Sequence, residues 1–254
     1  MNRIAVISDI HSNLPALEAV LAHVHTEGVD QVYCLGDVIG YGAEANETID
    51  LVRTTAEGRT VLGNHDKAIN VDDAFYTMGF NAVARSSLLY HKRVVSESNK
   101  RWLESLPVNI RMDDILFCHG APGDTDQYIF NEFDITMALD AEEAEGADLI
   151  FYGHTHVPLI VFREGSGVLM VERPPRRKWD SFEIELEPDN VYMINPGSVG
   201  QPRDGNAAAC YAILDRIGNR LTLHRVTYDV AKAQKSIRAA RLPEFLADRL
   251  FEGR

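Results

Sequence analysis

Histidine, aspartate and asparagine side chains recur in this sequence directly after short apolar segments. Asp9 and His11 follow the first such segment, and Asp37 follows the second. A histidine or aspartate alone at such a position is usually structural or simply solvated, but this pattern repeats along the chain. The later polar residues of the same kind are Asn64, His65, His119, His154 and His156.

Most of these side chains are of the types that bind metal ions. Imidazole and carboxylate ligands together suit Mn, Fe, Zn, Co or Ni better than Ca or Mg alone. If one carboxylate is shared, seven ligands are about enough for two ions that each keep a position for water. The sequence therefore predicts a pair of divalent transition-metal ions. The seven candidate ligands are Asp9, His11, Asp37, Asn64, His119, His154 and His156.

The first part of the chain alternates short apolar strands with amphipathic helices. Apolar, β-branched runs predict strands at Arg3–Ser8, Val32–Leu35 and Thr60–Leu62. Apolar residues at helical spacing predict helices from about Leu14 to Gly28 and from Ala45 to Ala56. This β-α-β-α-β order implies a parallel sheet with right-handed crossovers. Because open α/β sheets bind ligands beyond the carboxyl ends of their strands, the polar residues should meet at one edge.

The remainder of the chain is expected to mix helices and antiparallel strands. Residues 71–106 are mostly helical in pattern, and the tail at 230–251 is helical with a break at Pro243. The basic run from Arg173 to Lys178 is interpreted as a solvated hairpin tip in preference to a substrate clamp. Strand patterns recur at 115–118, at 149–152, as short antiparallel strands within 159–194, and as a hairpin at 211–214 and 221–226.

Composition narrows the possible partners and compartment. The chain has 254 residues and a formal net charge of −13, which disfavours stable binding of nucleic acids. Three cysteines imply no disulfide framework and fit a reducing compartment. Asp9 and His11 interrupt the first apolar run too early for a signal peptide, and no stretch suits a membrane span. We expect a cytoplasmic protein that does not bind membranes; its oligomeric state is left open.

Five motifs in a fixed order then resemble a known family. They are D-x-H at Asp9, G-D-x-x-G at Asp37, G-N-H-D at 63–66, H-G at His119 and G-H-x-H at His154. Each is weak alone, but five in order over about residues 8–156 strongly resemble the calcineurin-like metallophosphoesterases. The later N-P-G-S-x-G-x-P-R at 195–203 is similar to a bacterial branch of small phosphodiesterases, protein-phosphatase-like and diadenosine tetraphosphatase-like enzymes.

The resemblance implies an α/β (α+β) fold. This fold is a four-layer αββα sandwich, in which two mixed β-sheets face each other between outer helices. We expect one metallophosphoesterase domain over residues 1–254. Within it, the helical segment at about 71–106 is an insertion and a candidate cover for the site.

The resemblance also assigns roles to the candidate residues. It implies that Asp37 bridges two divalent ions, most often Mn, with Fe, Zn, Ni or Co as alternatives. It further implies that His65 is a catalytic residue that binds no metal and faces the substrate, with Asp66 orienting it. The remaining ligands would be Asp9, His11 and His156 for the first ion, and Asn64, His119 and His154 for the second.

One feature departs from the eukaryotic-type Ser/Thr phosphatases of that family. Those enzymes carry D-R-G after the G-D motif, and that arginine grips phosphate, whereas this chain reads G-D-V-I-G-Y-G from Gly36. Arg203, after a Gly- and Pro-rich turn, is a candidate substrate-binding residue because a guanidinium suits bidentate phosphate binding. A structural ion pair with an acidic neighbour is an equally good interpretation of Arg203.

The function implied is hydrolysis of phosphate mono- or diesters by a metal-bridging hydroxide, with His65 as proton donor. Dinucleoside polyphosphate hydrolysis and phosphoprotein dephosphorylation would use the same core. The partner would then be a small phosphorylated substrate or a phosphoprotein. Some proteins of this fold are non-catalytic interaction scaffolds, and these tend to lose the histidine of the G-N-H motif. The presence of His65 and Asp66 favours an enzyme over a scaffold.

Overall fold

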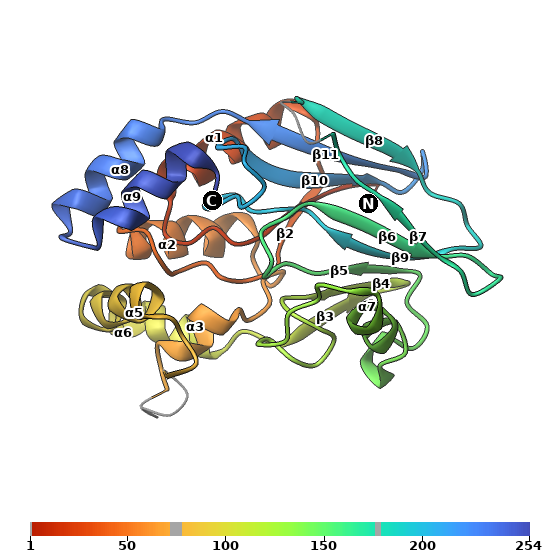
Figure 1. Ribbon diagram of the computed structural model, residues 1–254, viewed down its shortest axis with the longest axis horizontal. Coiled ribbons are helices and arrows are strands. Elements are labelled where there is room, and N and C mark those ends of the chain that lie inside the picture. Colours follow the sequence, from red (N-terminus) through yellow and green to blue (C-terminus); the bar gives the residue numbers. More distant parts are fainter. Residues whose placement is uncertain (1, 72–77, 176–178) are drawn as a thin grey trace.

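Two mixed β-sheets lie face to face, with helices on their outer sides (Figure 1). This computed structural model describes residues 2–71, 78–175 and 179–254. The layers are those of the predicted αββα sandwich, so the fold class is confirmed. No helix among the described residues has both the length and the apolar run that crossing a lipid bilayer requires.

The first sheet carries the N-terminal strands. Its strand order is β2 (Gln31–Cys34), β1 (Arg3–Ile7), β10 (Ala209–Asp215), β11 (Arg220–Val226) and β8 (Ser181–Glu185). β1 and β2 pair in parallel, and the other neighbours pair antiparallel. The carboxyl ends of β1 and β2 therefore lie at the same edge, as predicted.

The second sheet repeats this arrangement at its centre. Its strand order is β3 (Asn109–Met112), β4 (Ile115–Cys118), β5 (Leu149–Phe151), β9 (Val191–Asn195), β6 (Leu159–Arg163) and β7 (Leu169–Glu172). β4, β5 and β9 are parallel, whereas β3, β6 and β7 pair antiparallel to their neighbours. The predicted strands at 115–118 and 149–152 thus end side by side.

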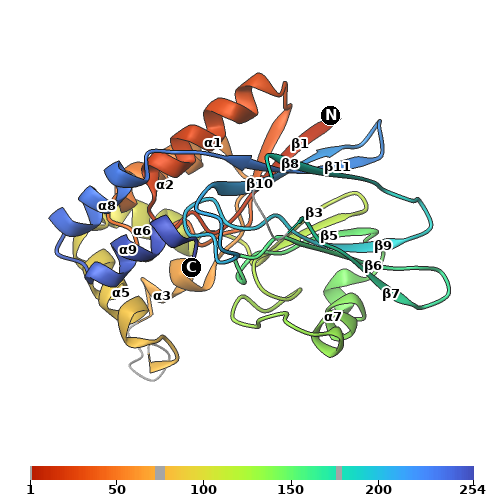
Figure 2. The same ribbon diagram turned by 45° about the horizontal axis from the view of Figure 1, so that its top comes forward.

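The helices cover the sandwich and close one end of it (Figure 2). α1 begins where Asn13 caps its first turn by accepting a hydrogen bond from the Ala16 amide, and Pro15 fits that turn. A group of helices that includes α3, α5, α6, α8 and α9 gathers at the left in both views. The described helices are α1 (Leu14–Thr26), α2 (Ala45–Thr55), α3 (Asn64–Ala68), α5 (Ala82–Val94), α6 (Glu97–Glu104), α7 (Glu132–Leu139), the 3-10 helix η1 (Glu142–Ala144), α8 (Val230–Ala239) and α9 (Glu244–Glu252).

The alternation of side chains along β1 fills two apolar layers. Ile4 and Val6 point between the sheets, where they join Phe117 and Phe151 of the second sheet. Ala5 and Ile7 pack against α1 and α2 on the other side of the sheet. Both faces of β1 are therefore buried, which explains its continuous apolar sequence and holds its carboxyl end firmly in place.

The structure differs from two local predictions and agrees with a third. Thr60–Leu62 does not form a strand, because only Thr60 pairs, in a single bridge to Cys34. The basic run is not a hairpin tip: residues 173–180 connect β7 of the second sheet to β8 of the first, and 176–178 lie outside the described residues. The helical prediction at 71–106 is met by α5 and α6, with 72–77 outside the described residues.

Candidate metal centre

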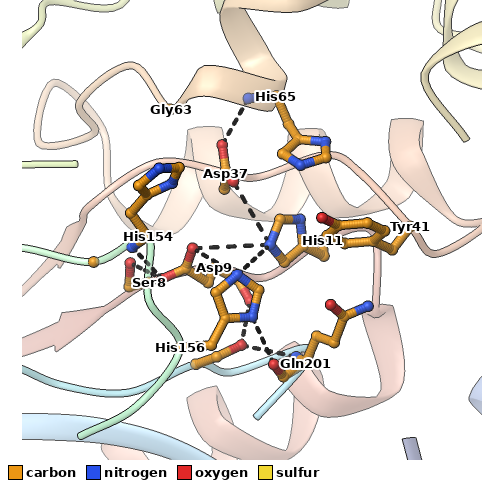
Figure 3. Close-up of polar contacts among 12 residues, drawn as sticks. Ser8, Asp9, His11, Asp37, Tyr41, Gly63, His65, His154, His156 and Gln201 are labelled. Atoms are coloured by element: carbon orange, nitrogen blue, oxygen red, sulfur yellow. Dashed lines mark hydrogen bonds and ion pairs between the residues drawn. The ribbon is translucent and has the colours of Figure 1, made fainter. Parts of the chain in front are cut away.

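All seven candidate ligands meet beyond the carboxyl ends of β1, β2, β4 and β5. Figure 3 shows Asp9, His11, Asp37, His154 and His156 of this set. Asp9 and His11 follow β1, and Asp37 follows β2. Each of the seven side chains is buried, none being more than 8% exposed. They form two groups around Asp37. We call Asp9, His11 and His156 the first-ion half, and Asn64, His119 and His154 the second-ion half.

The first-ion half brings three ligand atoms close together. Asp9 Oδ1 lies 3.3 Å from His156 Nε2, and His11 Nε2 lies 3.1 Å from that same nitrogen. His11 Nε2 also lies 3.6 Å from Asp37 Oδ2. Asp9 Oδ1 is buried, yet it has no hydrogen-bond partner. An uncompensated buried carboxylate oxygen is costly, so this group has the donor atoms and the unmet charge that a cation would satisfy.

The second-ion half has the same character. His119 Nε2 lies 3.2 Å from Asn64 Oδ1, 3.2 Å from His154 Nδ1 and 3.5 Å from Asp37 Oδ2. Asp37 Oδ2 therefore lies at nearly equal distances from His11 in one half and from His119 in the other. This is the position that a carboxylate shared between two ions would need.

Backbone carbonyls fix the protonation pattern of the four histidines in these halves. A ring nitrogen that donates to a carbonyl carries the hydrogen, so in a neutral ring the other nitrogen presents a lone pair. The lone pairs of His11 and His156 then face each other at 3.1 Å, which is repulsive unless a cation lies between them. The donating contacts are His11 Nδ1 to Ile39 O at 3.0 Å, His156 Nδ1 to Gln201 O at 2.6 Å, His119 Nδ1 to Leu35 O at 2.7 Å, and His154 Nε2 to Asp126 O at 3.3 Å.

The backbone at these ligands adopts a conformation that side chains rarely take. φ is positive at Asp9 (52°), His11 (52°), Asp37 (50°), His154 (66°) and His156 (62°). Such conformations are uncommon outside glycine and persist where the surrounding structure enforces them, often at functional sites. The strain thus gathers at the ligands themselves.

Two motif glycines are needed because ligands approach them closely. A Cβ on Gly63 would lie 2.2 Å from Asp37 Oδ1 and 2.1 Å from the Asp37 nitrogen. A Cβ on Gly153 would lie 2.1 Å from Ser8 Oγ and 2.8 Å from Asp9 Oδ2. The glycines of G-N-H-D and G-H-x-H therefore leave the space that the two aspartates occupy.

The charges of the two halves differ. Burial lowers the pKa of His11 and of His156 well below the usual value, and it lowers the pKa of His154 to about 3. Burial also lowers the pKa of His119, but the charge of Asp37 and the hydrogen bond that His119 donates to it outweigh this and raise that pKa to about 9. A proton on His119 is therefore what a cation in the second-ion half would displace.

His65 lies beside this set but is held differently. Its amide donates to Asp37 Oδ1 at 2.9 Å, while its Nδ1 has no hydrogen-bond partner. Geometry also allows His11, Asp37 and His65 to share an ion, so contacts alone leave a ligand role open to it. Its unanchored ring nevertheless sets it apart from the four histidines whose protons are fixed by carbonyls.

The hydrogen bonds of Asp66 are made to the main chain. Its carboxylate accepts hydrogen bonds from the amides of Val38, Ile39 and Gly63, at 3.0–3.2 Å. Among the described residues, none of its hydrogen bonds reaches the imidazole of His65. Asp66 therefore holds the loop after Asp37 and the start of α3, and it acts on His65 only through the backbone.

Arg203 faces the centre and forms no ion pair with a described carboxylate. Its Nη2 donates to Gln201 Oε1 at 3.1 Å and to Tyr41 Oη at 3.3 Å, while its buried Nε has no partner. Its main-chain amide donates to the His156 carbonyl at 3.2 Å, which places Arg203 beside the first-ion half. The geometry therefore favours the substrate-binding interpretation of Arg203 over a structural pair with an acidic neighbour.

A cavity of about 790 Å³ opens over the second-ion half. Asn64, His65 and His154 line it, together with Phe80 from the segment before α5 and Tyr128. The Tyr128 ring stacks on His154 with centroids 3.7 Å apart, a contact that no sequence motif indicated. Part of the predicted insertion at 71–106 thus forms a wall beside the site.

Comparisons with known proteins identify the family of this chain. A family model described as the calcineurin-like phosphoesterase superfamily domain matches residues 2–217. The uncharacterised protein MJ0912 of Methanocaldococcus jannaschii is 39% identical over 99% of this chain and 98% of its own length. A metallophosphoesterase of Sphaerobacter thermophilus has a similar structure, with a TM-score of 0.85 and 38% identity over 99% of this chain and 100% of that one. The hypothetical protein PH1004 of Pyrococcus horikoshii shares the fold, with a TM-score of 0.77 and 20% identity over 100% and 99% of the two chains.

Proposed function

Because the chain belongs to the calcineurin-like phosphoesterase superfamily, we propose that it hydrolyses phosphate mono- or diesters at a centre of two divalent metal ions. The observation that carries this proposal is the position of Asp37. Its Oδ2 lies 3.6 Å from His11 Nε2 and 3.5 Å from His119 Nε2, so one carboxylate oxygen serves both halves of the centre. Two adjacent metal positions that share a ligand are typical of phosphoester hydrolysis.

The donor set fits the ions that the proposal requires. Asp37 and the two halves supply imidazole, carboxylate and amide ligands, a combination that suits Mn, Fe, Zn, Ni or Co, with Mn our preferred assignment. When bound, such ions would activate a water molecule and neutralise charge on the phosphoryl oxygens. The carbonyls of Leu35, Ile39 and Gln201 hold the histidines in the required tautomer, which commonly strengthens metal binding 10- to 100-fold.

Two further residues act on the substrate in this proposal. His65 is among the residues that line the cavity, and its buried Nδ1 makes no hydrogen bond. No described contact therefore fixes the direction of its ring, which can turn to give a proton to the departing oxygen. Burial lowers the pKa of His65 to about 4 in the free protein, and a phosphate group beside it would favour the protonated form. Arg203 would bind a phosphoryl oxygen through its guanidinium.

The same metal centre would serve two more specific activities, the hydrolysis of a dinucleoside polyphosphate and the dephosphorylation of a phosphoprotein. The third alternative is an interaction scaffold of this fold without catalysis. His65 and a complete ligand set argue for catalysis, since a scaffold needs neither.

The proposal is tested by turnover of the full-length protein after removal and controlled return of metal. The panel comprises p-nitrophenyl phosphate, bis(p-nitrophenyl) phosphate, cyclic nucleotides, dinucleoside polyphosphates and a phosphopeptide, each with Mn, Ni, Co, Zn and Mg. We expect metal-dependent hydrolysis of at least one class. Tight binding of two ions with no turnover across the whole panel would favour the scaffold.

A further inference from the structure

Two arginines outside the ligand set lie against the same tyrosine at the edge of the metal centre. The guanidinium carbon of Arg203 is 5.7 Å from the centroid of the Tyr41 ring, and that of Arg249 is 5.9 Å from it. The centroid of the Tyr41 ring also lies 4.7 Å from the ring centroid of His11 and 4.7 Å from that of His65. The two arginines are therefore one aromatic ring away from the residues that would hold the reacting phosphate.

Neither arginine forms an ion pair with an aspartate or glutamate side chain in the part of the chain that the structure describes. Their neighbours do form such pairs: Arg225 contacts Asp204, and Arg238 contacts Glu244. Arg203 instead makes only neutral hydrogen bonds and keeps a buried Nε without a partner.

Arg249 is similarly placed. Its Nε donates to the main-chain oxygen of Arg254, and the other guanidinium nitrogens make no hydrogen bond within the described residues. Burial, followed by the charge of Arg203, lowers the pKa of Arg249 to about 10. Two half-buried like charges disfavour each other, and an anion bound to both would reduce that repulsion and supply acceptors for their unused N–H groups.

The chain brings Arg249 to this place from beyond the matched family domain. The family model ends at residue 217, whereas Arg249 lies in the last turn of α9. The Gly205 amide donates to the Gly253 carbonyl at 2.9 Å, so the end of α9 is fastened to the loop that follows Arg203. Gly253 has a φ of 66°, and a Cβ there would lie 2.6 Å from the Asn206 nitrogen. The close contact that sets the two arginines together therefore requires glycine at this position.

We propose that Arg203 and Arg249 form a second anion subsite beside the metal centre, and that this subsite binds a phosphate next to the one being cleaved. The preferred substrate is then a small molecule in which two or more phosphates are joined in a chain. Guanidinium groups suit this ligand because each can bind phosphate oxygens through paired hydrogen bonds. The inference rests on the proposed function, since the metal centre must hold the neighbouring phosphate.

The test compares two anions on the manganese-loaded, full-length protein by calorimetry. Inorganic phosphate can fill only one anion position, whereas inorganic tripolyphosphate can reach both. We expect the wild-type protein to bind tripolyphosphate more tightly than phosphate, and Arg249→Gln to reduce that preference about tenfold, as expected for lost hydrogen bonds to a charged group. Arg249→Lys keeps the charge without the planar fork, so it should lie between the two.

Arg254→Gln is the matched control, because it removes the same charge from the same end of the chain at an exposed side chain that contacts Glu252. It should keep the wild-type preference. An unchanged preference in folded Arg249→Gln and Arg249→Lys would overturn the subsite, and so would an equal loss of affinity for phosphate and tripolyphosphate. Turnover of bis(p-nitrophenyl) phosphate in the same samples reports separately on the proposed function. Wild-type protein that fails to turn over any substrate yet shows the arginine-dependent preference would reject the hydrolase and retain the anion subsite.

Discussion

The two halves of the metal centre contain similar ligands but differ in their access to solvent. In the first-ion half no side chain is more than 2% exposed, whereas Asn64 in the second-ion half is 8% exposed and His154 is 4% exposed. Asn64 and His154 line the large cavity, and no member of the first-ion half is among its described lining residues. If the proposed hydrolysis takes place, we expect its substrate to reach the centre from the second-ion side. The difference in exposure also suggests a resident ion in the closed half and a more exchangeable ion in the open one.

Removal of Asp37, the ligand that both halves share, should reduce turnover and metal binding the most. Asp37→Ala should abolish detectable turnover and lower metal occupancy at both positions, because both halves lose an anionic ligand and two cations lose their common counter-charge. The measurement is metal content by mass spectrometry together with kcat. Loss of one ion alone, with the other fully retained, would assign Asp37 to a single half and contradict its role as a shared ligand.

These ligands could be predicted because each belongs to a short motif, and all except Asn64 follow a strand. The groups that hold their rings in place could not be predicted. They are main-chain carbonyls, such as those of Leu35 and Ile39, and every residue has one, so no residue type marks them in the sequence. Nor could the Tyr128 contact, which depends on how a loop folds back over His154.

The fold shows a similar division. Local apolar periodicity correctly placed β1, β2, β4 and β5, and the late hairpin of β10 and β11. It could not show that Thr60 forms only a single bridge, to Cys34. Nor could it show that β8 belongs to the first sheet while β7 and β9 belong to the second. Strand pairing between distant segments is decided by packing, which a local pattern does not contain.

His65→Ala should lower turnover while both halves keep their ions. General acid catalysis typically contributes about 10²–10⁴-fold, and an alkoxide leaving group needs the proton more than a nitrophenolate does. We therefore expect a large loss of kcat for alkyl or nucleotide esters and a smaller one for p-nitrophenyl esters, with metal content measured in the same sample. An equal loss on both ester types would replace proton donation by charge stabilisation. Loss of an ion would make His65 a ligand, as its contacts with His11 and Asp37 permit.

The halves should also respond differently to pH. Because the pKa of His119 is raised to about 9, a proton competes with the second ion below that pH, and its affinity should fall by up to about tenfold per unit as the pH is lowered from 9 towards 7. In the first-ion half the histidine pKa values are lowered, and burial raises the pKa of Asp9 to about 6, so affinity there should be flat above pH 6 and fall below it. Calorimetric titrations with Mn at several pH values measure both steps. Parallel pH dependence of the two steps would contradict the contrast in charge.

The weakest of these effects is expected from an aromatic ring that lines the cavity beside the second-ion half. Tyr128 stacks on His154 at 3.7 Å and carries Phe130 on its ring at 4.9 Å, so Tyr128→Leu removes a contact to a second-ion ligand. Aromatic pairs contribute about 0.5–1.5 kcal/mol, which corresponds to a roughly 2- to 10-fold weaker second ion. Phe130→Leu is the matched control, because Phe130 is 71% exposed and has no ring contact with His154 in the part of the chain described. Metal titration of both variants should show the second ion weakened in Tyr128→Leu alone, with the first ion unchanged in each. An equal weakening of both ions by Tyr128→Leu would mean that the ring supports the whole centre, and the distinction between an open and a closed half would then not extend to the binding of the ions.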